Sequence, residues 1–116
     1  MRKFVSLAVV ALLASSMSAQ TIANMKDLNA EKKSAAINLK LTGTLTTTKN
    51  SDFRQLRDLC WQLRNLDLSE ATCPVLPKNA FHSRHHLQHI VLPNQLQEIG
   101  TQAFFACDNL QEVVIP

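Results

Sequence analysis

The hydrophobic residues in the last forty positions recur at a fixed spacing. Residues 76–93 read LPxxAFxxRxxLxxIxLP, and residues 99–116 read IGxxAFxxCxxLxxVxIP. Counterparts in the two blocks, such as Phe81 and Phe104, are 23 residues apart. A period of roughly 20–29 residues with leucine-like residues at fixed offsets is typical of a solenoid, in which each repeat forms one coil of a stack. The pattern therefore predicts stacked coils.

Each block predicts one strand and one opposing wall. Val113 and Ile115 are two residues apart, so a strand would turn both side chains into the coil and leave Val114 outside. The pair Ala103–Phe104 would lie on the opposite wall, with the aromatic ring filling the interior. Gly100 is expected in a turn conformation that is closed to other residues.

The strand pattern returns upstream with longer connections. Leu66–x–Leu68 repeats it 24 residues before Ile90–x–Leu92, and residues 37–41 alternate in the same way. The apolar positions of residues 53–63 share one helical face, and residues 22–33 fit a short amphipathic helix. The chain is thus predicted to be an α/β solenoid of about four coils. Its parallel strands would share one face, with helices in the first two coils and short turns in the last two.

The first nineteen residues form a separate unit. Met1–Arg2–Lys3 is followed by an apolar run over residues 4–14 and by small residues up to Ala19. This order is typical of a secretory signal peptide, and the run is shorter than the roughly 20 residues that span a bilayer. We predict a signal peptide over 1–19 and a solenoid domain over 20–116 whose helix-bearing coils occupy 20–68. The protein would be secreted or displayed at the cell surface, without a transmembrane segment.

Charge and glycine content argue against nucleic-acid and nucleotide partners. The chain has 12 Lys+Arg and 9 Asp+Glu, a net charge of +3. Removal of Arg2 and Lys3 with the signal peptide leaves 10 against 9, whereas nucleic-acid binding needs a concentrated basic patch. The only glycines, Gly43 and Gly100, cannot build a phosphate-binding loop. We therefore expect no nucleic-acid partner and no cofactor.

The three cysteines allow two interpretations. Cys107 is spaced as a core position of its coil, where Arg84 stands in the preceding one. A buried free thiol behaves as a small apolar residue, which is the interpretation we favour for Cys107. In an exported chain, a Cys60–Cys73 bridge across adjacent coils is the alternative that the spacing leaves open.

The histidine-rich stretch is the one candidate for metal chemistry. Its sequence is His82–x–x–His85–His86–x–x–His89, and imidazoles at helical spacing can bind zinc or copper. However, Phe81 and Leu87 are interior positions of the repeat, so the stretch should form a turn, and the nearest acidic residues are Glu70 and Glu98. We expect a solvated loop and keep metal binding as an alternative. No nucleophile has a convincing base partner, so we expect no catalytic residues and no enzymatic activity.

The outward side chains of the strands are the predicted binding surface. Stacked strands lie roughly 4.8 Å apart, so equivalent outward residues should form two short ladders on one sheet face. Mixed polar and apolar ladders on a solenoid suit protein or glycan binding. The alternative is that the ladders are merely solvated and their valines merely favour strands. One ladder contains Asn65, His89 and Glu112, and the other contains Asp67, Val91 and Val114.

The residues quoted for the last two coils closely resemble the BspA-type leucine-rich repeat of bacterial surface proteins. Leu41–Thr42–Gly43 and Leu63–x–x–Leu66–Asp67–Leu68–Ser69 resemble the N-terminal coils of such proteins, so the resemblance covers about residues 37–116. It implies export, surface display and adhesion to a protein partner, such as a host extracellular or cell-surface protein. It supplies no catalytic residues.

Two expectations concern the end of the chain. Members of this family usually have many more repeats, so one alternative is an N-terminal cap of a larger adhesin without independent activity. In addition, the last strand Val113–Val114–Ile115 has no polar cap after it. Solenoids need such caps, and an uncovered apolar edge favours self-association or fraying.

Overall fold

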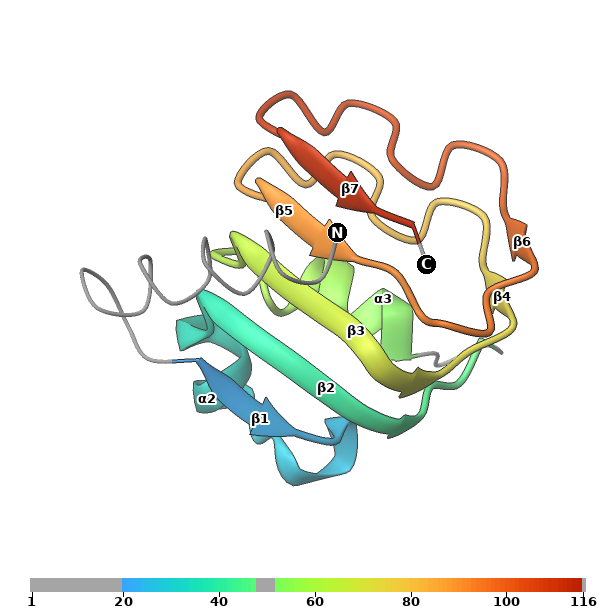
Figure 1. Ribbon diagram of the computed structural model, residues 1–116. Helices are drawn as coiled ribbons and strands as arrows, with labels where there is room; N and C mark the ends of the chain where they lie inside the picture. The colour runs from blue at the N-terminus through green and yellow to red at the C-terminus, as the bar shows by residue number, and fades with distance from the viewer. Residues whose placement is uncertain (1–19, 48–51, 116) are drawn as a thin grey trace.

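The computed structural model describes residues 20–47 and 52–115, and these form a parallel-strand solenoid of about three turns (Figure 1). The predicted signal peptide and Pro116 lie outside the described residues. Five strands form one sheet in the order β1-β2-β3-β5-β7. Since each strand is parallel to the next, the chain travels round a full coil between them. The strands are β1 (Thr21–Ala23), β2 (Asn38–Thr44), β3 (Asn65–Thr72), β5 (His89–Val91) and β7 (Glu112–Val114).

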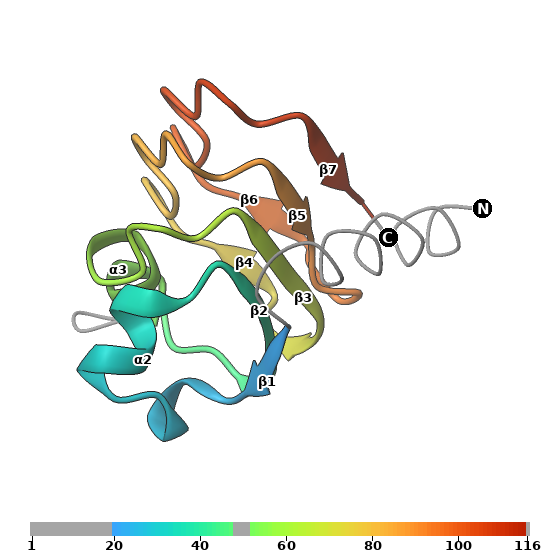
Figure 2. The ribbon, with the colours of Figure 1, turned by 90° about the vertical axis from the view of Figure 1, so that its left-hand side faces the viewer.

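The connections run along the side of the stack opposite the sheet, as Figure 2 shows. A 3-10 helix η1 (Met25–Asp27) and helix α2 (Ala30–Ala35) join β1 to β2, and α3 (Asp52–Asp58) precedes β3. The later coils have turns in this position. Parallel strands on one face, as predicted, are thus confirmed.

The single helix predicted over residues 22–33 is wrong. Ile22 lies in β1 and is 63% exposed, and the chain becomes α-helical only at Ala30. The cause is local, because Asn29 has extended backbone and its side chain accepts a hydrogen bond from the Lys32 amide at 2.8 Å. An asparagine in this position caps and starts a helix, so the apolar residues before it belong to other elements.

A second sheet of two strands was not predicted. It pairs β4 (Val75–Leu76) with β6 (Glu98–Ile99) in parallel, at one edge of the stack (Figure 1). Gly100 follows β6, and its φ is not in the left-handed region, which among the described glycines only Gly43 adopts. The expected special turn at Gly100 is therefore wrong. The need for glycine comes from close packing, since a Cβ there would lie 2.6 Å from the Lys78 amide nitrogen.

Shared carbonyl groups tie each coil to the next where the strands begin. The carbonyl of Ile37 accepts hydrogen bonds from the amides of Arg64 and Asn65, at 2.9 and 3.0 Å. In the same way, the Arg64 carbonyl accepts hydrogen bonds from the amides of Gln88 and His89. One coil later, the Gln88 carbonyl accepts them from the amides of Gln111 and Glu112. This repeated bridge fixes the register of the sheet, because it pairs equivalent positions of successive coils.

The opposite wall has its own repeated conformation. Asn79 and Ser83 have φ of 60° and 61°, and their counterparts Gln102 and Ala106 have φ of 57° and 61°. Backbone hydrogen bonds also link the wall between coils, for example from the Phe81 amide to the Ala103 carbonyl at 2.8 Å. The 23-residue period therefore repeats individual backbone angles as well as hydrophobic positions.

The core lies between the sheet and this wall. Phe53 and Phe81 meet edge to face with ring centroids 5.8 Å apart, and Phe104 stacks on Phe81 at the same distance. Val113 continues the inward row of Ile90 but is 36% exposed, because within residues 20–47 and 52–115 no coil covers its other side.

Ile115 is more exposed than its predicted interior position implies. It follows β7 and is 66% exposed. Its counterpart Leu92 likewise follows a strand, β5, but is fully buried. The exposure of Ile115 therefore has the same cause as that of Val113, because no coil within residues 20–47 and 52–115 covers the last strand.

Candidate functional site

Two columns of side chains run across one face of the sheet. Asn65 pairs with His89 and His89 with Glu112, while Asp67 pairs with Val91 and Val91 with Val114. Positions two apart in a strand share a face, so the two columns lie side by side.

Strand β2 extends both columns with residues that the sequence analysis missed. Asn38 pairs with Asn65, and Lys40 pairs with Asp67. The signal that could have found them is the 27-residue offset between the alternating segments of β2 and β3. The columns therefore contain Asn38, Asn65, His89 and Glu112 in one and Lys40, Asp67, Val91 and Val114 in the other.

The six predicted residues differ in accessibility. Asn65 and Val114 are buried, at 6% and 7% exposure, whereas Asp67, His89, Val91 and Glu112 are partly exposed. The Asn65 Nδ2 donates to Asn38 Oδ1 at 2.5 Å, and both asparagines are buried. This amide pair joins β2 to β3. The accessible part of the columns consists of Lys40, Asp67, His89, Val91 and Glu112.

Polar groups on this face approach each other across neighbouring strands. His89 Nδ1 lies 3.5 Å from Glu112 Oε1, and Lys40 forms an ion pair with Glu70. The hydrogen bond with Glu70 raises the pKa of Lys40, helped by the nearby Asp67. Asp67 and Glu70 both lie within β3, which extends to Thr72.

The histidines of the predicted loop separate in space. His85 Nδ1 lies 2.9 Å from Asp108 Oδ2, while His82 Nδ1 contacts Ser83 Oγ at 2.8 Å and stacks on Phe105. The carboxylate near His85 comes from the next coil, 23 residues later. The acidic residues nearest to the histidines in sequence, Glu70 and Glu98, did not predict this contact, although the 23-residue period points to Asp108. Among the described residues no three His, Cys, Asp or Glu side chains are grouped to hold a metal ion.

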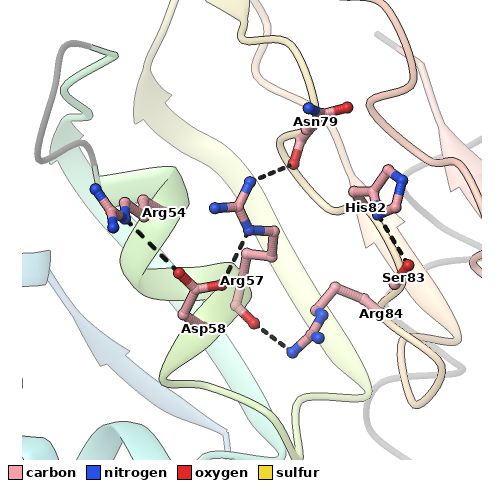
Figure 3. A network of polar contacts seen from close by, with 7 residues as sticks. All are labelled: Arg54, Arg57, Asp58, Asn79, His82, Ser83 and Arg84. Carbon is pink, nitrogen blue, oxygen red and sulfur yellow. Dashed lines mark hydrogen bonds and ion pairs between the residues drawn. The ribbon is translucent and has the colours of Figure 1, made fainter.

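Arginines connect α3 to the turns of the next coil, as Figure 3 shows. Arg57 Nε donates to Asp58 Oδ1 at 3.0 Å, and its Nη1 donates to the Asn79 carbonyl at 3.0 Å. Arg84 donates in turn to the Arg57 carbonyl. The hydrogen bond from Arg57 lowers the pKa of Asp58. These contacts hold two coils together.

The three cysteines are free thiols. Cys60 and Cys73 are buried, and Cys107 is half-buried with its Sγ donating to the Phe81 carbonyl at 3.0 Å. Burial raises the pKa of all three thiols, that of Cys60 to about 11. A raised pKa keeps a thiol protonated and inert, so this environment does not activate a nucleophile.

None of the helices in the described part of the chain has the length and apolar character to cross a membrane.

Comparisons with known proteins agree with the solenoid geometry. Searches of curated proteins and of solved structures gave no match. The family described as BspA type leucine rich repeat region matches residues 19–116 in 6 copies. The chain therefore belongs to the BspA-type leucine-rich repeat family.

Proposed function

We propose that this chain is an exported, non-catalytic binding protein, secreted or held at the cell surface, that binds a protein partner through the sheet face. Repeat families of this type are typically binding scaffolds, and membership suggests a role in protein interaction. The finer organisation predicted from sequence belongs to the same proposal: a signal peptide over 1–19, then four coils with helices in the first two.

The observation that carries the proposal is the register of the two columns. It brings the partly exposed residues Asp67, His89 and Val91 together on adjacent strands. A carboxylate, an imidazole and an aliphatic side chain on a rigid sheet offer polar and apolar contacts without ordering a loop. A preorganised surface binds with a smaller entropic cost.

The experiment compares two matched double variants on an array of purified extracellular-matrix and plasma proteins. His89→Gln with Asp67→Asn changes the sheet face, and His82→Gln with Asp108→Asn changes the same residue types on the turns. For an array protein that the chain binds, we expect at least about tenfold weaker binding by the sheet-face variant and little change in the other.

Equal loss in both variants would contradict the proposed face. Absence of binding to every array protein would instead favour the alternative of coils that belong to a larger adhesin and have no activity of their own. Melting temperatures of both variants should stay close to that of the unchanged chain, because all four side chains are at least partly exposed.

A further inference from the structure

A second surface lies where the chain enters the strands, directly before the column residues Asn38 and Asn65. A cavity of about 80 Å³ is lined by Trp61, Gln62 and Arg64 before β3, by Ile37 before β2 and by His86 before β5. Trp61 is 53% exposed and is the only tryptophan of the chain. Three successive coils thus contribute to one small site with an open indole ring.

Arg64 gives this cavity a positive charge. Arg64 and His86 line it and are exposed, and in residues 20–47 and 52–115 neither has a carboxylate partner. No acidic residue lines the cavity. An arginine guanidinium presents planar donors that match a carboxylate in a two-point contact.

A smaller space lies next to this cavity and shares two lining residues with it, Trp61 and His86. About 10 Å³, close to the room that one water needs, is enclosed by residues that include Trp61, His86 and Arg84. The Arg84 Nε is buried and has no hydrogen-bond partner within the described part of the chain. A buried donor without a partner costs free energy, so this nitrogen favours an oxygen atom in the adjoining space.

From these features we propose that the cavity binds an acidic saccharide unit, a pyranose that carries a carboxylate. The apolar face of the sugar ring would stack on Trp61, and the carboxylate would receive hydrogen bonds from Arg64. Hydroxyl groups would meet His86 and the Gln62 amide, which is held in place by a 2.8 Å hydrogen bond from its Nε2 to the Ser34 carbonyl. The cavity of about 80 Å³ can seat part of one sugar ring at its open side, whereas an extended peptide would need further pockets at alternate positions.

Intrinsic fluorescence tests the proposal directly, because Trp61 is the only tryptophan. The purified chain is titrated with trigalacturonate, which carries uronic acids, and with sialyllactose, which carries a sialic acid. Maltotriose is the neutral control, and hexaglutamate tests an acidic peptide. We expect a saturable change in Trp61 emission with at least one acidic sugar and none with maltotriose or hexaglutamate.

Variants assign the effect to the cavity. Arg64→Gln should weaken binding of the acidic sugar by about tenfold, because it removes the carboxylate contact. Arg54→Gln removes the same charge from a position on α3 that does not line the cavity, and it should leave affinity unchanged. Equal binding of maltotriose, binding of hexaglutamate alone, no saturable change with either acidic sugar, or equal loss in both variants would overturn the proposal.

Discussion

His85 and Asp108 lie 23 residues apart in sequence and in contact in space, with 2.9 Å between His85 Nδ1 and Asp108 Oδ2. Asn109 adds a hydrogen bond from its Nδ2 to the His85 carbonyl at 2.6 Å. One coil thus holds the exposed turn of the coil before it. The same period relates His89 to Glu112, so the repeat sets polar contacts between coils as well as packing.

This pair should contribute little to stability. Both side chains are mostly exposed, so in a double-mutant cycle with His85→Gln and Asp108→Asn we expect a coupling energy below about 1 kcal/mol. Urea unfolding of the four proteins measures it. A coupling energy above about 2 kcal/mol would mean that the pair is far better shielded from water than its exposure indicates.

The stacked phenylalanines should matter much more. Phe81 is buried between Phe53 and Phe104, so Phe81→Ala should lower the free energy of unfolding by about 3–5 kcal/mol. Phe105 is exposed and is the matched control, and Phe105→Ala should cost less than about 1 kcal/mol. Similar costs for the two variants, measured by urea unfolding, would contradict the placement of the core. Phe81→Leu provides a milder variant that keeps most of the packing.

Close packing at Gly100 should make it intolerant of a methyl group. A Cβ would meet backbone atoms of Leu76, Pro77 and Lys78 within 2.8 Å, so the neighbouring coil must move. We expect Gly100→Ala to lower the free energy of unfolding by about 1–3 kcal/mol. Thr101 is the next residue and is exposed, so Thr101→Ala should change the free energy of unfolding by less than about 0.5 kcal/mol. Thermal or urea unfolding measures both, and a neutral Gly100→Ala would mean that the two coils are not in such contact.

The thiols should react slowly while the chain is folded. The pKa of Cys60 is raised to about 11 by burial, so at pH 8 the thiolate that attacks a disulfide reagent is scarce. With Ellman's reagent we expect slow release of its coloured thiolate product in the native state, with Cys107, which is half-buried, reacting fastest. After denaturation without reductant, all three thiols should react. One thiol after denaturation would instead reveal the Cys60–Cys73 bridge that the spacing alone left open.

The period in the sequence predicted the stack because each coil repeats the same contacts. Phe81 and Phe104 share an offset, and so do the inward residues Ile90 and Val113, so alignment of the repeat places all four correctly. Where the period is weaker, the prediction failed. Residues 22–33 contain apolar residues at helical spacing, but Asn29 starts α2 late and leaves Ile22 in a strand.

The candidate site was only partly predictable, because register does not determine exposure. The offsets correctly aligned Asn65 with His89, but they gave no sign that the Asn65 amide is buried against Asn38. The offsets also aligned His89 with Glu112, whereas the carboxylate beside His85 was not predicted. The acidic residues nearest in sequence are Glu70 and Glu98, but in a solenoid the spatial neighbour lies one period away, and for His85 this is Asp108.

The most direct test of the proposed sheet-face binding is an NMR map of the complex. Isotope-labelled chain is titrated with a matrix or plasma protein that it binds on the array, and backbone amide signals are followed residue by residue. We expect the largest changes at Asp67, His89, Val91 and Glu112. Changes confined to the turns at residues 79–86 and 101–106, with the sheet signals unmoved, would contradict binding through the sheet face.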